Sequence, residues 1–255
     1  MNAYLINNID EIIAALDKVI SEAEKNNDTS GYFATVYRKA TLRIKEEIVS
    51  GQFENSSRIE KISVFIARNY FEAHSNFINK KPVTISWRKA FRLSKNSHPI
   101  VLQHLLMGIN AQMNLAFGVA IAEVAEGKSL DELEADFNHV HGIFATVLRE
   151  VQDNISSDWL TLKLLLKITG AIDKYLFDHI IADGRDETWR FANHYATISK
   201  VNKSRAFSFR DQEVAAKTEV ILNPRLMDRF IFRLIHITET GSVARKIKKM
   251  EQSAN

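Results

Sequence analysis

The sequence predicts an all-α fold: a single-domain multi-helix bundle of about eight to ten helices around a central helix at residues 98–126. Seven or more segments repeat apolar residues at the 3.6-residue helical spacing or begin with a helix cap, and none shows sustained alternation. Nine glycines and three prolines in 255 residues are few for an all-β chain, in which turns need both. The length is enough for a sizeable core. We expect residues 1–242 to form the domain and residues 243–255 to be a basic, frayed tail.

Three amphipathic helices are expected before residue 80. Apolar residues recur at helical spacing over 9–20, over 32–49 and over 59–77. A capping-box pattern formed by Ser57 and Glu60 predicts the start of the third helix.

A basic segment follows at residues 80–98, and it contains no acidic residue. Its six cationic residues are Lys80, Lys81, Arg88, Lys89, Arg92 and Lys95. One interpretation is a docking patch for phosphate or for an anionic surface. The other is a short solvated helix with Trp87 and Phe91 pointing inward, which the sequence favours because single basic helices are common on near-neutral proteins.

The central 98–126 segment is long, apolar and uncharged until Glu123. Helical spacing nevertheless places Gln103, Asn110 and Asn114 in one narrow arc, which we call the amide face. Burying an unpaired amide costs a few kcal/mol. These side chains therefore either bond to neighbouring helices as a structural network or line a polar pocket that holds water or a ligand.

The second half of the chain is expected to contain three more helical stretches. A capping box at Ser129 opens a helix that runs to about residue 151, and a long helical pattern follows over 159–199, with a kink at Gly170 or Gly184. Residues 200–210 are basic and loop-like. Asn223 and Pro224 supply an N-cap and a first helical proline for the last helix.

Two charged residues are expected to meet the amide face. Asp136 flanks the apolar seam of the helix that begins at Ser129, and Arg185 lies four residues before Trp189. Both would be partly buried, and because a buried charge requires a partner, we predict that they form an ion pair. This pair is either purely structural or part of a binding site.

The sequence predicts no cofactor and no bound metal. The eight histidines are scattered without helical metal-binding pairs, and the zero cysteine count removes disulfides and thiolate zinc sites. No phosphate-cradling glycine loop and no nucleophile elbow is present.

Composition also restricts partners and location. The net charge of +3, from 34 basic and 31 acidic residues, is too near balance to indicate a nucleic-acid partner. The N-terminus lacks the pattern of a signal peptide, and no window reaches the roughly 18 apolar residues of a membrane span without including amides. We therefore expect a cytoplasmic protein with no transmembrane segment; its oligomeric state stays open.

Three sequence blocks carry a resemblance: QHLLMGINAQMNL at 103–115, LEADFN at 133–138 and RDETWRFA at 185–192. They are similar to an uncharacterised bacterial all-helical family of unknown function with a Gln-His-Leu-Leu-x-Gly-x-Asn-Ala-His-x-Asn-Leu core block. The resemblance implies a helical fold and six candidate ligand-binding positions: His104, Asn110, Asn114, Asp136, Arg185 and Trp189. Gln112 stands where that pattern has His, and Ala116 where it has Asp, which weakens the case for catalysis here.

Three classes of function are compatible with the sequence. The first is a polar internal pocket that binds a small molecule and either only holds it or also acts on it. The second is a scaffolding or interaction module whose buried polar groups hold helices in register. The third is docking to anionic surfaces through residues 80–98 and the basic tail. A cavity that reaches solvent beside Asn110 and Asn114 would favour the first class, and a dry, paired network would favour the second.

Overall fold

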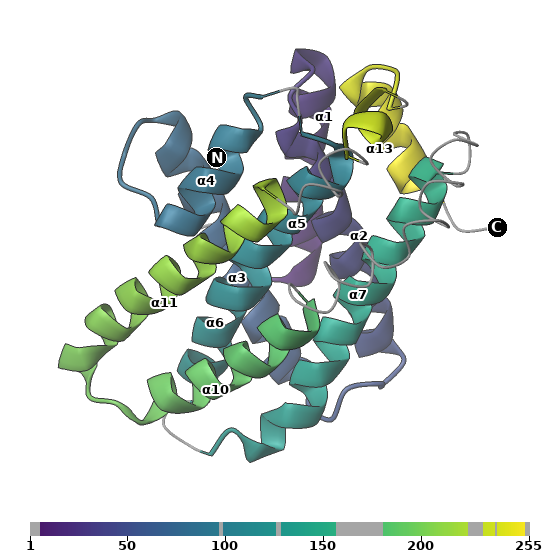
Figure 1. Cartoon of the computed structure of the whole chain (residues 1–255). Coiled ribbons are helices and arrows are strands. Elements are labelled where there is room, and N and C mark those ends of the chain that lie inside the picture. The colour runs from purple at the N-terminus through teal and green to yellow at the C-terminus, as the bar shows by residue number, and fades with distance from the viewer. Residues whose placement is uncertain are drawn as a thin grey trace.

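The structure is a computed structural model, and it describes residues 6–96, 99–125, 129–156, 181–223, 232–237 and 239–252. Every regular element within these ranges is helical, which confirms the predicted all-α class. The elements surround a long central helix (Figure 1).

The three helices predicted before residue 80 are confirmed. They are α1 (Ile9–Asn26), α2 (Ser30–Val49) and α3 (Ser56–Ile78). The predicted capping box of the third helix is wrong, because the N-cap is Asn55, whose side chain accepts from the backbone N–H of Arg58. Glu60 instead accepts a hydrogen bond from the backbone N–H of Ile9 at 3.3 Å, and so ties α3 to the start of α1.

The central helix runs without a break from Val101 to Val124. It consists of α5 (Val101–Ala111), a π-helical turn η2 (Gln112–Ala116) and α6 (Phe117–Val124). Among the helices of the described ranges, this one is long and apolar enough to cross a membrane, but its apolar window is entirely buried inside the protein. It is therefore the core helix of the fold.

Four further helices pack around this centre. They are α4 (Ile85–Leu93), α7 (Glu134–Ser156, after a short 3₁₀ turn η3 at Asp131–Leu133), α10 (Asp183–Thr197) and α11 (Lys200–Leu222). Helix α11 crosses α4, α5 and η2, while α10 lies against α6 and η2 (Figure 1). The central helix is thus covered on one side by α10 and α11 and on another by α2.

The loop predicted at residues 200–210 is wrong, because these residues form the first half of α11. The apolar residues of this helix do not gather on one face, so the periodicity that reveals other helices is missing. Polar contacts hold it in place instead. Asp211, for example, accepts hydrogen bonds from the backbone N–H groups of Ile85 and Ser86 at the start of α4.

The frayed tail predicted from residue 243 is also corrected by the structure. Residues Val243–Glu251 form α13, whose N-cap is Ser242 and which packs against α1, α2 and α7. Ile247 and Met250 are fully buried. Gly31 of α2 allows this close approach, since a Cβ there would lie 2.7 Å from the Ile247 side chain.

Other predictions about the second half are tested only in part. The predicted long helix from 159 to 199 is described from residue 181 onward, and residues 157–180 lie outside the described ranges, as does Gly170. Gly184 lies inside the first turn of α10. Of the helix predicted after Pro224, residues 232–237 are described and are helical.

Candidate functional site

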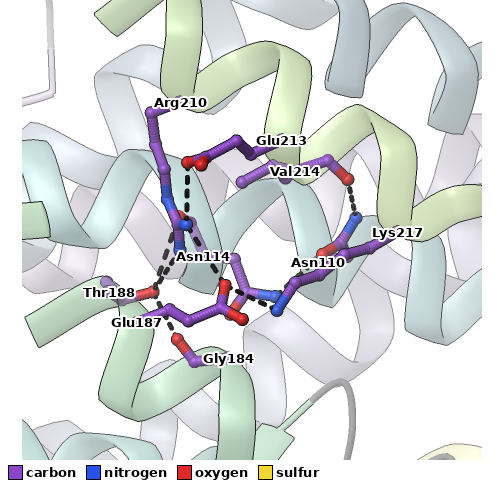
Figure 2. A network of polar contacts seen from close by, with 9 residues as sticks. All are labelled: Asn110, Asn114, Gly184, Glu187, Thr188, Arg210, Glu213, Val214 and Lys217. Carbon is purple, nitrogen blue, oxygen red and sulfur yellow. Dashed lines mark hydrogen bonds and ion pairs between the residues drawn. The ribbon is translucent and has the colours of Figure 1, made fainter. Parts of the chain in front are cut away.

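The amide face connects the central helix to α11. Asn110 and Asn114 are almost completely buried, at 0% and 1% exposure. The Asn114 Nδ2 donates to Oδ1 of Asn110 at 2.8 Å, and Nδ2 of Asn110 donates to the carbonyl of Val214 at 2.8 Å (Figure 2). Gln103, the third member, accepts from the N–H of Ile100 and donates to the carbonyl of Ile221. This face is therefore a paired network.

The π-helical turn gives this network its second branch. Such turns shift the backbone hydrogen bonding by one residue and occur frequently at functional sites. Here the Phe117 N–H donates to the Gln112 carbonyl, and the carbonyl of Asn114 inside the turn accepts from Arg210 Nε at 3.1 Å. The Thr188 hydroxyl also lies 3.5 Å from that carbonyl. The turn thus links α10 and α11 through one backbone oxygen.

Arg210 is the charged centre of the site, and only 4% of its side chain is exposed. Its Nη1 contacts carboxylate oxygens of Glu187 at 3.2 Å and Glu213 at 3.3 Å, while Nη2 donates to the Thr188 hydroxyl at 3.3 Å (Figure 2). The guanidinium also lies 5.7 Å from the centre of the Phe191 ring. Each nitrogen therefore has a partner, as a buried cation requires.

A second cation, Lys217, completes the charge balance of the site. Its Nζ lies 2.8 Å from the Glu187 carboxylate. Burial alone would raise the pKa of the Glu187 carboxyl, but Lys217 and Arg210 outweigh burial and hold the pKa below its ordinary value. Glu187 is therefore ionised at neutral pH, and its charge is neutralised inside the protein.

The charged residues of this network (Glu187, Arg210, Glu213 and Lys217) line a groove between α10 and α11 with a volume of about 770 Å³. The volume lies within the range of small-molecule sites, which is roughly 300–1,000 Å³. Besides the ion-paired residues, the lining contains Arg190, Phe191, His194 and Phe209. We call this feature the α10–α11 groove. Asn110 and Asn114 lie behind it and do not line it.

The predicted ion pair between Asp136 and Arg185 is wrong. The Asp136 carboxylate accepts from the backbone N–H groups of Glu54 and Asn55, at 2.9 and 3.2 Å, and so fixes the loop before α3. The Arg185 side chain is 43% exposed and binds Asp186. A carboxylate that accepts two backbone hydrogen bonds is satisfied without a cation.

The six predicted positions do not form one site. His104 lies 3.3 Å from the Thr29 hydroxyl through Nδ1. Burial, together with the positive charge of Lys246, lowers the pKa of His104 to about 4, so this ring is neutral at pH 7. Trp189 packs against Phe137, with ring centres 4.9 Å apart. The contacts join only Asn110 and Asn114, and the other four positions have separate neighbours.

Sequence reasoning missed the residues on α10 and α11 that complete the network. Arg210 fell within the segment interpreted as a loop, and no motif marks Thr188. The sequence contains one weak indication at Gln112, which stands where the family pattern has His. It is 0% exposed, yet neither polar atom of its amide has a regular hydrogen bond among the described residues.

A metal centre has little support in the described ranges, where no three His, Asp or Glu side chains lie close enough together to hold an ion. The buried histidines stand apart from acidic clusters. His141, for example, packs against the rings of Phe117 and Phe137, and burial lowers its pKa to about 3. The predicted lack of a bound metal stays a prediction, which elemental analysis of the purified protein would test.

Comparison with known proteins gives a family but no activity. No curated protein and no solved structure matches the chain. Residues 9–224 match a family of unknown function, and this range includes the central helix and both helices of the groove. Since the match covers most of the chain, the protein belongs to the family of unknown function DUF5995.

Proposed function

We propose that the protein binds a small organic acid in the α10–α11 groove. The observation that carries this proposal is the buried, fully paired guanidinium of Arg210 at the floor of a groove that opens to solvent. The floor is held from behind by the π-helical turn and the amide face.

Stability alone is a poor explanation for this arrangement. Replacing all members of a buried ion pair together by apolar side chains of similar volume is often neutral or stabilising, so an apolar contact between α10 and α11 could stabilise the fold equally well. A binding site, in contrast, benefits from side chains that are fixed before the ligand arrives. Arg210 on α11 bonds to Thr188 and Glu187 on α10, so the two helices that line the groove are joined directly.

The charges of the groove indicate the chemistry of the ligand. Glu187 is already neutralised by Arg210 and Lys217, and Glu213 contacts Arg210. Arg190 is exposed and forms no ion pair within the described part of the chain. A free guanidinium binds a carboxylate through two parallel hydrogen bonds.

The aromatic residues of the groove favour a ligand with an apolar portion. Phe209 is 61% exposed, which is unusual for so large an apolar side chain, and it shares the groove with Phe191. An aromatic or branched aliphatic acid would cover both rings while its carboxylate meets Arg190.

A second candidate function is a non-enzymatic scaffolding or interaction module. The observation in its favour is the dry, mutual pairing of Asn110 and Asn114, which a structural network explains without any ligand. In that case the amide face would serve only to fix α11 against the central helix.

The test is a thermal-shift screen of aromatic and branched aliphatic carboxylic acids. Wild type is compared with Ala206→Trp, which fills the α10–α11 groove, and with Ser204→Trp, which places the same side chain on α11 outside the groove. We expect acids that stabilise wild type and Ser204→Trp but not Ala206→Trp. Isotope-labelled Arg190 should show the largest change in its NMR signals.

Two outcomes would contradict the proposal. One is that no acid in the panel raises the melting temperature of wild type. The other is that acids stabilise both tryptophan variants equally, which would place binding elsewhere. A groove that binds no acid, in a protein whose amide network is needed for folding, would favour the scaffolding function.

A further inference from the structure

A second groove lies between the end of α3 and the outer face of α4, with a volume of about 840 Å³. We call it the basic groove, because its lining contains five cationic side chains and one carboxylate. These are Lys80, Lys81, Arg88, Arg92 and Lys95, with Asp28. A neighbouring, smaller depression shares only Pro82 and Val83 with it.

The charge of this groove stands out from that of the whole protein. Five positive charges and one negative charge give the lining a formal charge of +4. The entire chain has a formal charge of +3, so the remainder of the chain carries −1. The excess positive charge of the protein is therefore concentrated at one place, where it raises the local concentration of anions.

Four of these five cations form no ion pair within the described part of the chain. Lys95 binds Asp28 at 2.7 Å. Among the described residues, no carboxylate forms an ion pair with Lys80, Lys81, Arg88 or Arg92. Elsewhere on the surface, cations such as Lys45 and Lys203 are paired with nearby carboxylates. The basic groove therefore has charges that are available to a ligand.

The cations of α4 lie on two different faces of the helix, as Lys89 shows. This residue points toward α11, where its Nζ contacts Thr218 at 2.9 Å and Glu219 at 3.3 Å. Arg88 and Arg92, one helical turn apart, are exposed on the other side and line the groove. The helix thus uses one cation for anchoring and directs two to the basic groove.

The backbone that carries these cations is fixed by its surroundings. The Asp211 carboxylate accepts from the N–H groups of Ile85 and Ser86, at 2.6 and 2.9 Å, which holds the first turn of α4. Trp87 and Phe91 anchor the inner face in the core. At the other wall, Lys80 has a φ of 57°, the left-handed conformation that ends α3, and the Lys81 N–H donates to the Asn76 carbonyl at 2.8 Å.

We propose that the basic groove binds a small ligand that carries two or more phosphate groups. Several free cations on a fixed backbone suit a multiply charged anion, whereas the single free guanidinium of the α10–α11 groove suits one carboxylate. Phe77, Pro82 and Val83 add an apolar wall for the rest of the ligand. The inference concerns a different surface from the proposed function and does not depend on it.

The experiment measures binding of inorganic tripolyphosphate by isothermal titration calorimetry in low-salt buffer. It compares wild type with Arg88→Gln/Arg92→Gln and with the control Lys200→Gln/Arg205→Gln, which removes the same charge from exposed positions on α11. We expect one tripolyphosphate per chain. The groove variant should bind at least about tenfold more weakly, which corresponds to losing about 1.4 kcal/mol of binding free energy, and the control should change less than about twofold. Urea unfolding of all three proteins confirms that each is folded.

A phosphate can also belong to a lipid headgroup, and a second arm separates the two sources. The same proteins are sedimented with vesicles of phosphatidylcholine and phosphatidylserine. We expect no sedimentation of wild type. The proposal is overturned if tripolyphosphate does not bind, if both double variants lose binding equally, or if vesicles bind through Arg88 and Arg92 while tripolyphosphate does not. The last result would identify an anionic membrane surface as the partner.

Discussion

The central helix directs buried amides toward two neighbouring helices. We call the side that faces α11 the paired side and the side that faces α2 the unpaired side, because the amides differ in their hydrogen bonding. Toward α11, Asn110 and Asn114 are bonded to each other and to the Val214 carbonyl. Toward α2, Gln112 is equally buried, but its amide makes no regular hydrogen bond among the described residues. It does lie close enough to the Tyr37 hydroxyl to oppose the rise in the Tyr37 pKa that burial causes.

Burial alone therefore does not guarantee a hydrogen-bond partner. Asn110 and Asn114 meet a helix that offers a backbone carbonyl and the guanidinium of Arg210. Gln112 meets aromatic residues, since Tyr37 is surrounded by the rings of Phe33 and Tyr70. An unsatisfied buried amide costs about 1–3 kcal/mol, so the two amide environments should differ measurably in their effect on stability.

The largest change in the free energy of unfolding is expected from removing Arg210, which bonds to the paired side of the central helix. Arg210→Met removes a buried cation and leaves the Thr188 hydroxyl and the carboxylate of Glu187 without it. Removing one partner of a buried pair usually lowers the free energy of unfolding by about 3–5 kcal/mol. Because Glu187 and Glu213 are partly exposed, we expect a value near the lower end. Urea unfolding measures it.

Arg190→Met is the matched control, since Arg190 lines the same groove without an ion pair in the described ranges. It should change the free energy of unfolding by less than about 0.5 kcal/mol. Equal losses of unfolding free energy in both variants would show that the buried ion pairs of Arg210 do not stabilise the protein.

The next effect concerns His104, whose Nε2 has no hydrogen-bond partner among the described residues. Burial and Lys246 lower its pKa to about 4, while the unfolded chain has a value near 6.5. Below pH 6.5 the unfolded state therefore binds the proton more tightly, and stability falls as the pH decreases toward 4. The loss should reach about 3 kcal/mol at pH 4.

His104→Asn should remove this acid sensitivity, because an Asn side chain can keep the contact with Thr29 but does not titrate. The measurement is urea unfolding at a series of pH values between 4 and 7. His194→Asn, on an exposed position of α10, is the control. If His104→Asn and wild type lose stability in parallel, then the ring is not held neutral in the folded protein.

Much of the fold could be predicted from the sequence, and the failure at α11 has a physical cause. The helices α1, α2 and α3 follow apolar repeats at helical spacing, which the sequence states directly. Helix α11 does not, because it is held by Asp211, Arg210 and similar polar contacts. A helix that packs through polar groups gives no periodic signal.

Of the candidate site, only the amides on the central helix could be predicted from the sequence. The cost of burying amides correctly indicated that Asn110 and Asn114 need partners, and the structure supplies them. The same argument applied to Asp136 and Arg185 gave the wrong pair, because it assumed that a buried carboxylate needs a cation. Backbone N–H groups of Glu54 and Asn55 satisfy Asp136 instead, and no sequence pattern places that loop beside α7.

A smaller loss is expected from Asn114→Leu, which removes one node of the paired side. Leucine has the same branching and the same number of side-chain heavy atoms as asparagine and is a better helix former, so helix propensity does not by itself predict a loss. The variant leaves Oδ1 of Asn110 without its donor. We expect the free energy of unfolding to fall by about 1–3 kcal/mol, with an unchanged dependence on urea concentration.

Asn202→Leu makes the same chemical change at an exposed position of α11 and should be nearly neutral. If Asn114→Leu is as stable as wild type, then water satisfies the partners of Asn114, and the amide face lines a hydrated space.

The smallest effect, with the opposite sign, is expected from Gln112→Met on the unpaired side. Methionine has a similar length and fills irregular spaces well, while it removes an amide whose hydrogen bonds are unmet. The free energy of unfolding should stay constant or rise by up to about 1 kcal/mol. Urea unfolding again measures the change, with exposed Gln212→Met as the control. A loss above about 1 kcal/mol would show instead that Gln112 bonds to the Tyr37 hydroxyl in solution, and the contrast between the two sides would disappear. A gain would mean that the protein retains Gln112 at the expense of stability, which is the pattern expected of a residue kept for function.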